Sequence, residues 1–427
     1  MTRVCSSKIA QVLHYSESSL SHDSRPTEPT VSSGRSKRFL LLVALALLGL
    51  ITVVVYVWLR DEPPPDDSDL QPPPFEAIAE SDNSVPALIA AEALLIEPDD
   101  WVGLESRQQE GGQIDWDAVA VTMAGNEAYF AAVDAALARP RSQVERAETV
   151  SDLSPHIMPL RSCATWLTDR SLWLAHRGDV AASIDVWERW AKHVSDLSRS
   201  PGTLLDSVLF MAMRRQCSAT AVELGFSEGV TGEQIQRLQS QVASAPGFFA
   251  LAPVALRDEY RVTKASIREW IPPEVQGFTS TFMYKENATL RAYGDSIRSA
   301  IRAFEERDPT LLPGRSGRTS HVRMFSSGNY TGEVILSLLL PTLLPLYEKA
   351  LASERAGHVH RIALALRRYE LENGALPSTL AELAPKWLEA ETLEAPVQYD
   401  RDARWVGLER PDDLTPTAPP RIAVQDR

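Results

Sequence analysis

The chain has 427 residues, of which 44% are hydrophobic and 23% charged, a composition typical of globular proteins and not of disordered chains. Its net charge of −14 is unevenly distributed, because residues 1–38 carry six basic and three acidic side chains whereas the rest of the chain is strongly acidic. An acidic main part argues against nucleic acid as a partner, since phosphate binding requires a cationic surface.

The stretch Phe39–Leu59 contains no charged residue and, as a helix, would span about 30 Å, the thickness of a bilayer's hydrocarbon core. Tyr56 and Trp58 lie near its distal end, where aromatic side chains favour the headgroup level. Basic residues precede the stretch, acidic residues follow it, and no small-x-small cleavage site comes after it. We therefore expect an uncleaved single-pass anchor in the inner (cytoplasmic) membrane, with the N-terminus in the cytoplasm and the C-terminal body in the periplasm.

Changes in composition predict how the rest of the chain is divided. Two proline triplets separated by acidic residues favour extended polyproline II, so the segment after the anchor is expected to be a stiff spacer that holds the body away from the membrane. The predicted parts are a disordered cytoplasmic tail (1–38), the transmembrane helix (39–59), a Pro/acidic spacer (60–75), a helical body (76–307), a loop (308–327), a long kinked helix with a small C-terminal element (328–410) and a flexible tail (411–427).

Apolar residues three and four positions apart dominate the body and predict a mainly α-helical fold. The clearest unit is an αα-hairpin at 161–199, in which Gly178 ends the first helix and Asp179 caps the second. A third helix is predicted at Thr203–Leu224. Further helices are expected at Val85–Ile96, Trp116–Ala138, Gly232–Ser244, Pro253–Trp270 and Tyr284–Glu306.

A final long helix is expected from Thr331 onward. Pro341 and Pro345 interrupt its apolar start, which is too short and too broken for a second membrane span, so we expect a kinked and buried helix. Farther along, one apolar stripe is expected to pack against this chain's own helices. It consists of Val359, Ile362, Leu366 and Tyr369.

The segment after this helix carries signals for small structured elements. Thr379 and Glu382 have the spacing of a capping box, which predicts a short helix. Val397–Tyr399 and Trp405–Leu408 alternate enough to predict one β-hairpin.

The run ALALRRYELENGALP at 363–377, followed by TLAEL at 379–383 and by Tyr399, resembles the part of type II secretion pseudopilins that follows their long helix. There the usual pattern is A-L-x-x-Y-x-x-x-x-G-x-Y-P-x-x-L-x-x-L, ending in a P-x-x-Y strand. The segment is also similar to a group of uncharacterised single-span bacterial envelope proteins. The resemblance covers 328–408 and implies a small α+β pseudopilin-like element and a link to secretion.

Residues that could carry chemistry are few, and we expect neither a metal nor a cofactor. His358 and His360 are two residues apart on a helix, so they face different directions, and we expect them to be solvated rather than to bind zinc. Carboxylates that could work as a pair are Asp115, Asp117, Asp258 and Glu259. Tryptophans that either line an aromatic groove or, as we expect, pack in the core are Trp166, Trp173, Trp187 and Trp190.

Two other groups are candidate sites. Cys163 and Cys217 would lie in an oxidising compartment and form a possible disulfide, although small thiols also pack well unpaired. Arg315, Arg318 and Arg323 form a possible interaction surface for an acidic partner or lipid headgroups, with a solvated loop as the alternative.

Two functions remain open from the sequence. The first is a membrane-anchored periplasmic helical protein that acts without catalysis as a scaffold or accessory factor for protein partners in the cell envelope. The alternative is a periplasmic hydrolase that uses a carboxylate pair in a cleft between helices. Converging carboxylates in a deep cleft would favour the second.

Overall fold

The computed structural model describes residues 33–98, 104, 114–152, 155–200, 202–244, 247–267, 284–313, 328–389, 392–393, 397–408 and 421–423. The chain forms two compact units, Met1–Trp58 and Leu59–Arg427. Helix α1, Ser33–Leu59, makes up the described part of the first unit, and its side chains from Arg38 to Tyr56 are exposed.

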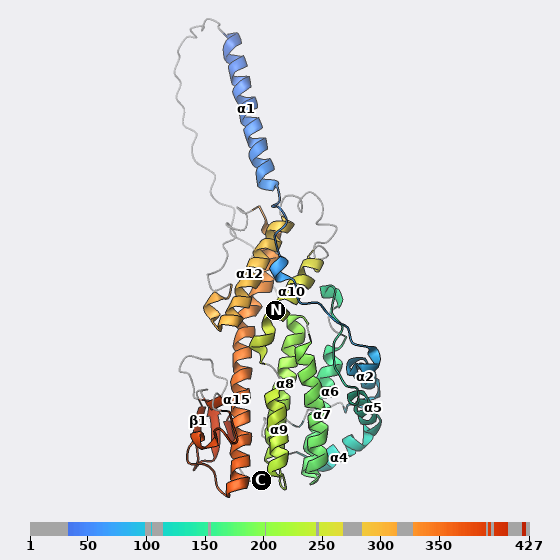
Figure 1. Ribbon diagram of the computed structural model, residues 1–427. Helices are drawn as coiled ribbons and strands as arrows, with labels where there is room; N and C mark the ends of the chain where they lie inside the picture. Colours follow the sequence, from blue (N-terminus) through green and yellow to red (C-terminus); the bar gives the residue numbers. More distant parts are fainter. Residues whose placement is uncertain are drawn as a thin grey trace, which may run out of the picture. The chain divides into compact units, whose positions relative to one another are not determined.

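The second unit, which we call the body, is mainly helical, as expected (Figure 1). Its first helices form a small group in which α2 packs on α5 and α6. The single helix expected at 116–138 is divided into two at Asn126. The side chain of Asn126 accepts a hydrogen bond from Ile96 N at 2.8 Å and donates one to Ile96 O at 2.9 Å. These elements are α2 (Ser84–Ala91), η3 (Glu92–Leu94), α4 (Trp116–Gly125) and α5 (Glu127–Leu137).

The predicted αα-hairpin is confirmed by α6, Ile157–His176, and α7, Val180–Arg199. Gly178 adopts φ = 83°, a left-handed conformation that suits glycine, and the side chain of Asp179 accepts a hydrogen bond from Ala182 N. Two further helices then lie beside the hairpin (Figure 1). They are α8 (Leu204–Gly225), which Thr203 caps, and α9 (Gly232–Ser244).

A second helical group is built on α10, Phe248–Ser266, and α12, Glu286–Glu306, which pack against each other. The segment 61–71, here called the strap, lies along both of these helices and does not stand free. Asp61 accepts hydrogen bonds from Asn287 N and Ala288 N, at 2.9 and 3.3 Å, and so caps the start of α12.

The strap is also held by its apolar and acidic side chains. Leu70, in the short helix η1 (Ser68–Leu70), is buried in the core of this group, close to Gly294 of α12, whose missing side chain leaves room for it. Asp69 pairs with Arg298 at 2.8 Å, and Asp67 pairs with Lys264. Asp61, Asp67 and Asp69 are therefore bound to the body, whereas Asp66 accepts hydrogen bonds from Ser68 within the strap.

The final long helix is interrupted by a 3-10 turn at 340–342, within the segment where a kink is expected. Helix α14, Tyr330–Leu339, begins after Asn329 rather than at Thr331, and η6, Leu340–Thr342, connects it to α15, Leu343–Asn373. By length and composition alone, Arg38–Tyr56 and Tyr330–Asn373 could each cross a membrane. The second of these is partly packed in the body, because Leu336, Leu343, Leu346 and Tyr347 are buried in it.

The body has two hydrophobic cores, and α15 belongs to both. Its first turns pack with α10 and α12, while its second half packs with α8 and α9. The predicted stripe is confirmed, since Val359, Ile362 and Leu366 are fully buried and Tyr369 is partly buried. Gly225 of α8 allows close approach here, because a Cβ would lie 2.6 Å from Leu364 Cδ2.

The small C-terminal element packs on the second half of α15 (Figure 1). Thr379 and Glu382 form the expected capping box at η7, Leu380–Leu383. The predicted hairpin is confirmed by β1, Val397–Asp400, paired antiparallel with β2, Trp405–Leu408. A flexible tail is expected at 411–427, but the structure differs from this expectation. Arg421–Ala423 forms β3, which pairs with β2.

Candidate functional site

A cavity of about 220 Å³ lies where the two cores meet, between α8, the start of α10 and α15. Helix α8 contributes one face at intervals of three and four residues, with Ser207, Arg214 and Ser218 among its members. Helix α15 contributes a second such face, with Glu354 and Arg361 among its members. The volume is below that of sites for drug-sized ligands, so the cavity suits a small ligand.

Three arginines are among the residues that line the cavity. Arg214 and Arg361 are partly buried, and burial followed by the neighbouring Arg361 guanidinium lowers the pKa of Arg214. Burial likewise lowers the pKa of Arg361. Both side chains still carry their charge at neutral pH, because the ordinary pKa of arginine is above 12. Arg215 adds a third positive charge to the lining.

The described lining of the cavity contains little negative charge. Glu354 is the one carboxylate among the described lining residues, and Arg307 binds both of its oxygens, at 2.8 and 2.9 Å. Arg215 and Arg361 form no ion pair within the described part of the chain. The closest polar contact of Arg361 is a hydrogen bond to His358 Nδ1 at 3.3 Å. Guanidinium groups held close together in a low dielectric repel each other, and an anion between them would relieve that repulsion.

His360 is the second unusual feature of the cavity. It lies on α15, lines the cavity and is 7% exposed, so the expectation of solvated histidines is wrong for this residue. The expectation failed because the helix is enclosed on several sides by α8, α9 and the C-terminal element. Among the described residues, its Nδ1 has no hydrogen-bond partner. Leaving such a buried group unpaired costs roughly 1–3 kcal/mol.

A second, more open hollow of about 430 Å³ lies between the strap, α10 and α12. The basic side chains on its wall already have acidic partners, because Arg261 binds Asp258 at 2.9 Å and Lys264 binds Asp67. Its charges are therefore used to hold the strap and the adjoining loop, and we take the cationic cavity as the candidate site.

The carboxylates considered for a catalytic pair have structural partners instead. Asp258 is fully buried and forms ion pairs with Arg146 and Arg261, with nitrogen–oxygen distances of 2.6 and 2.9 Å. Its neighbour Glu259 turns elsewhere and accepts a hydrogen bond from Leu204 N at 3.2 Å, while burial raises its pKa. The two carboxylates therefore do not converge.

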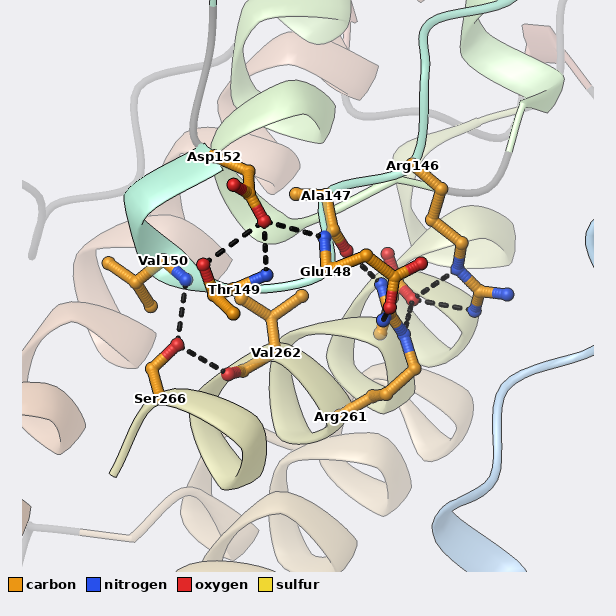
Figure 2. Close-up of polar contacts among 10 residues, drawn as sticks. Arg146, Ala147, Glu148, Thr149, Val150, Asp152, Arg261, Val262 and Ser266 are labelled. Atoms are coloured by element: carbon orange, nitrogen blue, oxygen red, sulfur yellow. Dashed lines mark hydrogen bonds and ion pairs between the residues drawn. The ribbon is translucent and has the colours of Figure 1, made fainter. Parts of the chain in front are cut away.

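Figure 2 shows polar contacts that hold the segment before α6 against α10. Val150 N donates to Ser266 Oγ at 2.7 Å, and Asp152 accepts from Thr149 N at 2.7 Å and from Thr149 Oγ1. Arg261 also donates to the carbonyl oxygen of Ala147. The network ties this loop to α10 and is a structural feature.

Two buried histidines lie next to a serine or an aspartate, as in some catalytic sites, but each is hydrogen-bonded within the fold. His193 forms a hydrogen bond to Ser142 Oγ through Nδ1. Its Nε2 lies 2.9 Å from the carbonyl oxygen of Leu137. His156 Nε2 lies 2.7 Å from Asp206 Oδ1, and the other oxygen of Asp206 caps α8 with Thr203. Asp115 caps α4 by accepting from Asp117 N and Ala118 N.

The other candidate residues are placed as follows. Cys163 and Cys217 are buried and are not joined by a disulfide, and burial raises the pKa of Cys163 to about 12. Trp166, Trp187 and Trp190 are buried in the first core and Trp173 packs against it, so they form core and not a groove. Arg315, Arg318 and Arg323 lie outside the described residues.

Sequence reasoning missed Arg214 and Arg361 as a pair. A signal was present, because polar residues recur at helical spacing on the α8 and α15 segments, as in Ser207, Arg214 and Ser218 or in Glu354, His358 and Arg361. Nothing in the sequence, however, indicates that the two faces lie opposite each other.

No protein-family model, curated protein or solved structure matches this chain. The site is therefore interpreted from its own geometry.

Proposed function

We propose that this protein is a membrane-anchored, non-enzymatic binding protein of the cell envelope, whose periplasmic helical body takes up a small organic or inorganic oxyanion. In this proposal Phe39–Leu59 is the anchor, the N-terminus is cytoplasmic and the body serves as an accessory factor for protein partners in the envelope. The resemblance of 363–383 to pseudopilins suggests secretion components as those partners.

The observation that carries the proposal is the presence of Arg215 and Arg361, which form no ion pair within the described residues, in the lining of one small cavity whose single described carboxylate is bound by Arg307. Guanidinium groups bind carboxylates and phosphates through parallel N–H···O hydrogen bonds, and such bonds are strongest where water is excluded. An anion placed between two guanidinium groups is attracted to both of them.

The hydrolase alternative has less support. A carboxylate-pair mechanism requires two acids on either side of a substrate, whereas Asp258 and Glu259 have separate partners inside the fold. Within the described lining of the cavity, only Glu354 is acidic.

Thermal unfolding of the full-length protein in lipid nanodiscs tests the proposal, with inorganic phosphate and succinate as probes and sodium chloride as the control at equal ionic strength. A ligand that binds only the folded state stabilises it, so each anion that binds should raise Tm by several degrees at saturating concentration. Chloride at the same ionic strength should not.

Matched variants identify the site. Arg361→Met should abolish the rise in Tm, while Arg355→Met, on the same helix but outside the described cavity lining, should keep it. Without ligand, Arg361→Met should be as stable as the wild type or more so, because the substitution removes a repelling buried charge. The proposal is wrong if neither anion raises Tm, or if Arg361→Met responds as the wild type does.

A further inference from the structure

One apolar stretch of the body is only partly covered by the rest of the chain. From Val334 to Tyr347 the sequence contains no charged residue, and this stretch runs from α14 through η6 into α15. Within Tyr330–Asn373, only 29% of the apolar window of 18 residues is buried. A helix that serves only as core buries most of its apolar surface, so the stretch has apolar surface left for another environment.

The uncovered side chains lie on one face of α14. Val334 and Leu338 are four residues apart and so lie on the same side of the helix, with Ile335 beside them. Leu338 is 72% exposed, and Val334 and Ile335 are half-buried. Leu336, on the opposite side, is buried in the second core. Helix α14 is therefore apolar on its outward face as well as on its inward face, and we call Val334, Ile335 and Leu338 the outer face.

The start of α14 is held close to the point where the anchor helix ends. Asn329, just before α14, accepts a hydrogen bond from Lys285 N at 2.8 Å and so lies at the beginning of α12. Asp61 accepts one from Asn287 N, in the first turn of the same helix, at 2.9 Å. Asp61 follows Leu59, the last residue of α1, by two positions, and two residues of chain span about 7 Å at most. The starts of α12 and α14 therefore follow the end of the anchor closely.

These observations favour a lipid surface as the environment of the outer face. Helix α14 has 10 residues and is about 15 Å long, too short to cross a bilayer but long enough to lie in its surface. An interfacial helix buries an apolar face at the boundary between headgroups and acyl chains. The anchor keeps the outer face at a high effective concentration beside the bilayer, so even a small apolar contact is sufficient.

We propose that the outer face of α14 lies in the periplasmic surface of the membrane that holds the anchor, as a second and shallow contact of the body with lipid. This proposal rests on the anchor of the proposed function and adds to it an interaction surface. It is independent of the anion site.

Fluorescence quenching by lipid tests the proposal on the full-length protein in nanodiscs. Bimane is attached to a cysteine introduced by Leu338→Cys, Ala292→Cys or Leu47→Cys, and the lipids carry a nitroxide on the acyl chain. Leu47 lies in the anchor, and Ala292 is exposed on α12 near its start, so the two variants report full insertion and mere proximity. Leu338→Cys should be quenched about threefold more than Ala292→Cys, because an interfacial helix places its apolar side chains among the acyl chains.

Labelling is confined to the introduced cysteine. Cys5→Ser removes one native thiol, and the other two, Cys163 and Cys217, are buried.

A second pair of variants tests whether the apolar side chain causes the contact. With bimane at Val334→Cys, the exchange Leu338→Asp should lower the quenching by about threefold or more, because a charge is costly to place in lipid. Val121→Asp is the matched control and should leave the quenching unchanged. Val121 is 74% exposed on α4, which packs on α5 and α6 and not on α12.

The outcomes separate this proposal from the anchor on which it rests. Quenching of Leu338→Cys no stronger than that of Ala292→Cys overturns the proposal, as does quenching that persists with Leu338→Asp. A blue-shifted bimane emission without quenching by lipid also overturns it, because the outer face is then covered by protein, either a second copy or another segment of this chain. Absence of quenching in Leu47→Cys contradicts the anchor and the proposal with it. If the Leu338→Asp variant does not fold, the comparison of Leu338→Cys with Ala292→Cys still decides.

Discussion

Some charged side chains in this body are buried together with an oppositely charged partner, and others are not. Asp258 is fully buried, but Arg146 and Arg261 bind it directly, so its charge is compensated inside the fold. Arg361 is also partly buried, yet its hydrogen bond goes to a histidine and not to an acid. Compensated charges hold elements together, whereas an uncompensated one in a cavity remains available to a ligand.

His360 provides a prediction about pH. Its pKa in the folded protein is about 4, below the ordinary value of 6.5, so between these values the unfolded chain binds the proton more readily than the folded one. The free energy of unfolding should therefore fall as the pH is lowered from about 6.5 to about 4. The gap between the two pKa values corresponds to roughly 3 kcal/mol at most.

Urea unfolding of the ligand-free protein across this pH range measures the effect. Burial also lowers the pKa of His193 and of His358, so the wild-type slope contains more than one contribution. The comparison with His360→Phe isolates the contribution of His360, since the variant lacks that proton site. An identical pH dependence in the two proteins would show that His360 does not titrate as expected.

At the scale of elements, α15 is the helix on which both cores and the cavity depend. Its stripe is buried against this chain's own helices, so we expect Leu366→Asp to lower the free energy of unfolding by about 4 kcal/mol or more, because it places an unpaired charge in a packed core. Leu338→Asp is the matched control. Leu338 is 72% exposed on α14, and the same exchange there should cost about 0.5 kcal/mol or less.

Denaturant unfolding of the two variants measures both values. A Leu366→Asp protein that stays as stable as the wild type but no longer binds an envelope partner would show that the stripe is an interface.

The structure of the strap differs from the one that its composition predicts. Proline triplets and acidic residues favour a stiff, self-repelling chain, yet α10 and α12 provide basic side chains and a helix start at matching positions. Arg298 binds Asp69, Lys264 binds Asp67, and the first turn of α12 binds Asp61. These contacts stabilise the segment on the body.

At the scale of the whole molecule, the prediction concerns orientation. We expect an N-in, C-out topology, because basic residues precede Phe39–Leu59 and acidic residues follow it. Alkaline phosphatase fused after residue 80 should be active, and green fluorescent protein fused there should be dark. Fusions after residue 34, before the anchor, are the control and should give the opposite pair of results. Inactive phosphatase together with fluorescence after residue 80 would reverse the orientation.

The sequence by itself determined the features that arise from neighbouring residues. The hairpin turn at Gly178-Asp179, the helix interruption at 340–342, the capping box of Thr379 with Glu382 and the β1–β2 hairpin were all predictable, because each results from backbone preferences over a few positions. The buried stripe of α15 was predictable for a similar reason, since helical spacing places its residues on one face.

Only the tertiary structure decided which faces meet. It brought Arg214 of α8 and Arg361 of α15 to one cavity, enclosed His360, gave Asp258 its two arginines and added β3 to the sheet. These outcomes depend on contacts between segments far apart in the chain, and no local pattern encodes such a contact. The burial of a charged group, and with it the pKa and the ligand it can bind, follows from its neighbours in space and not from its neighbours in sequence.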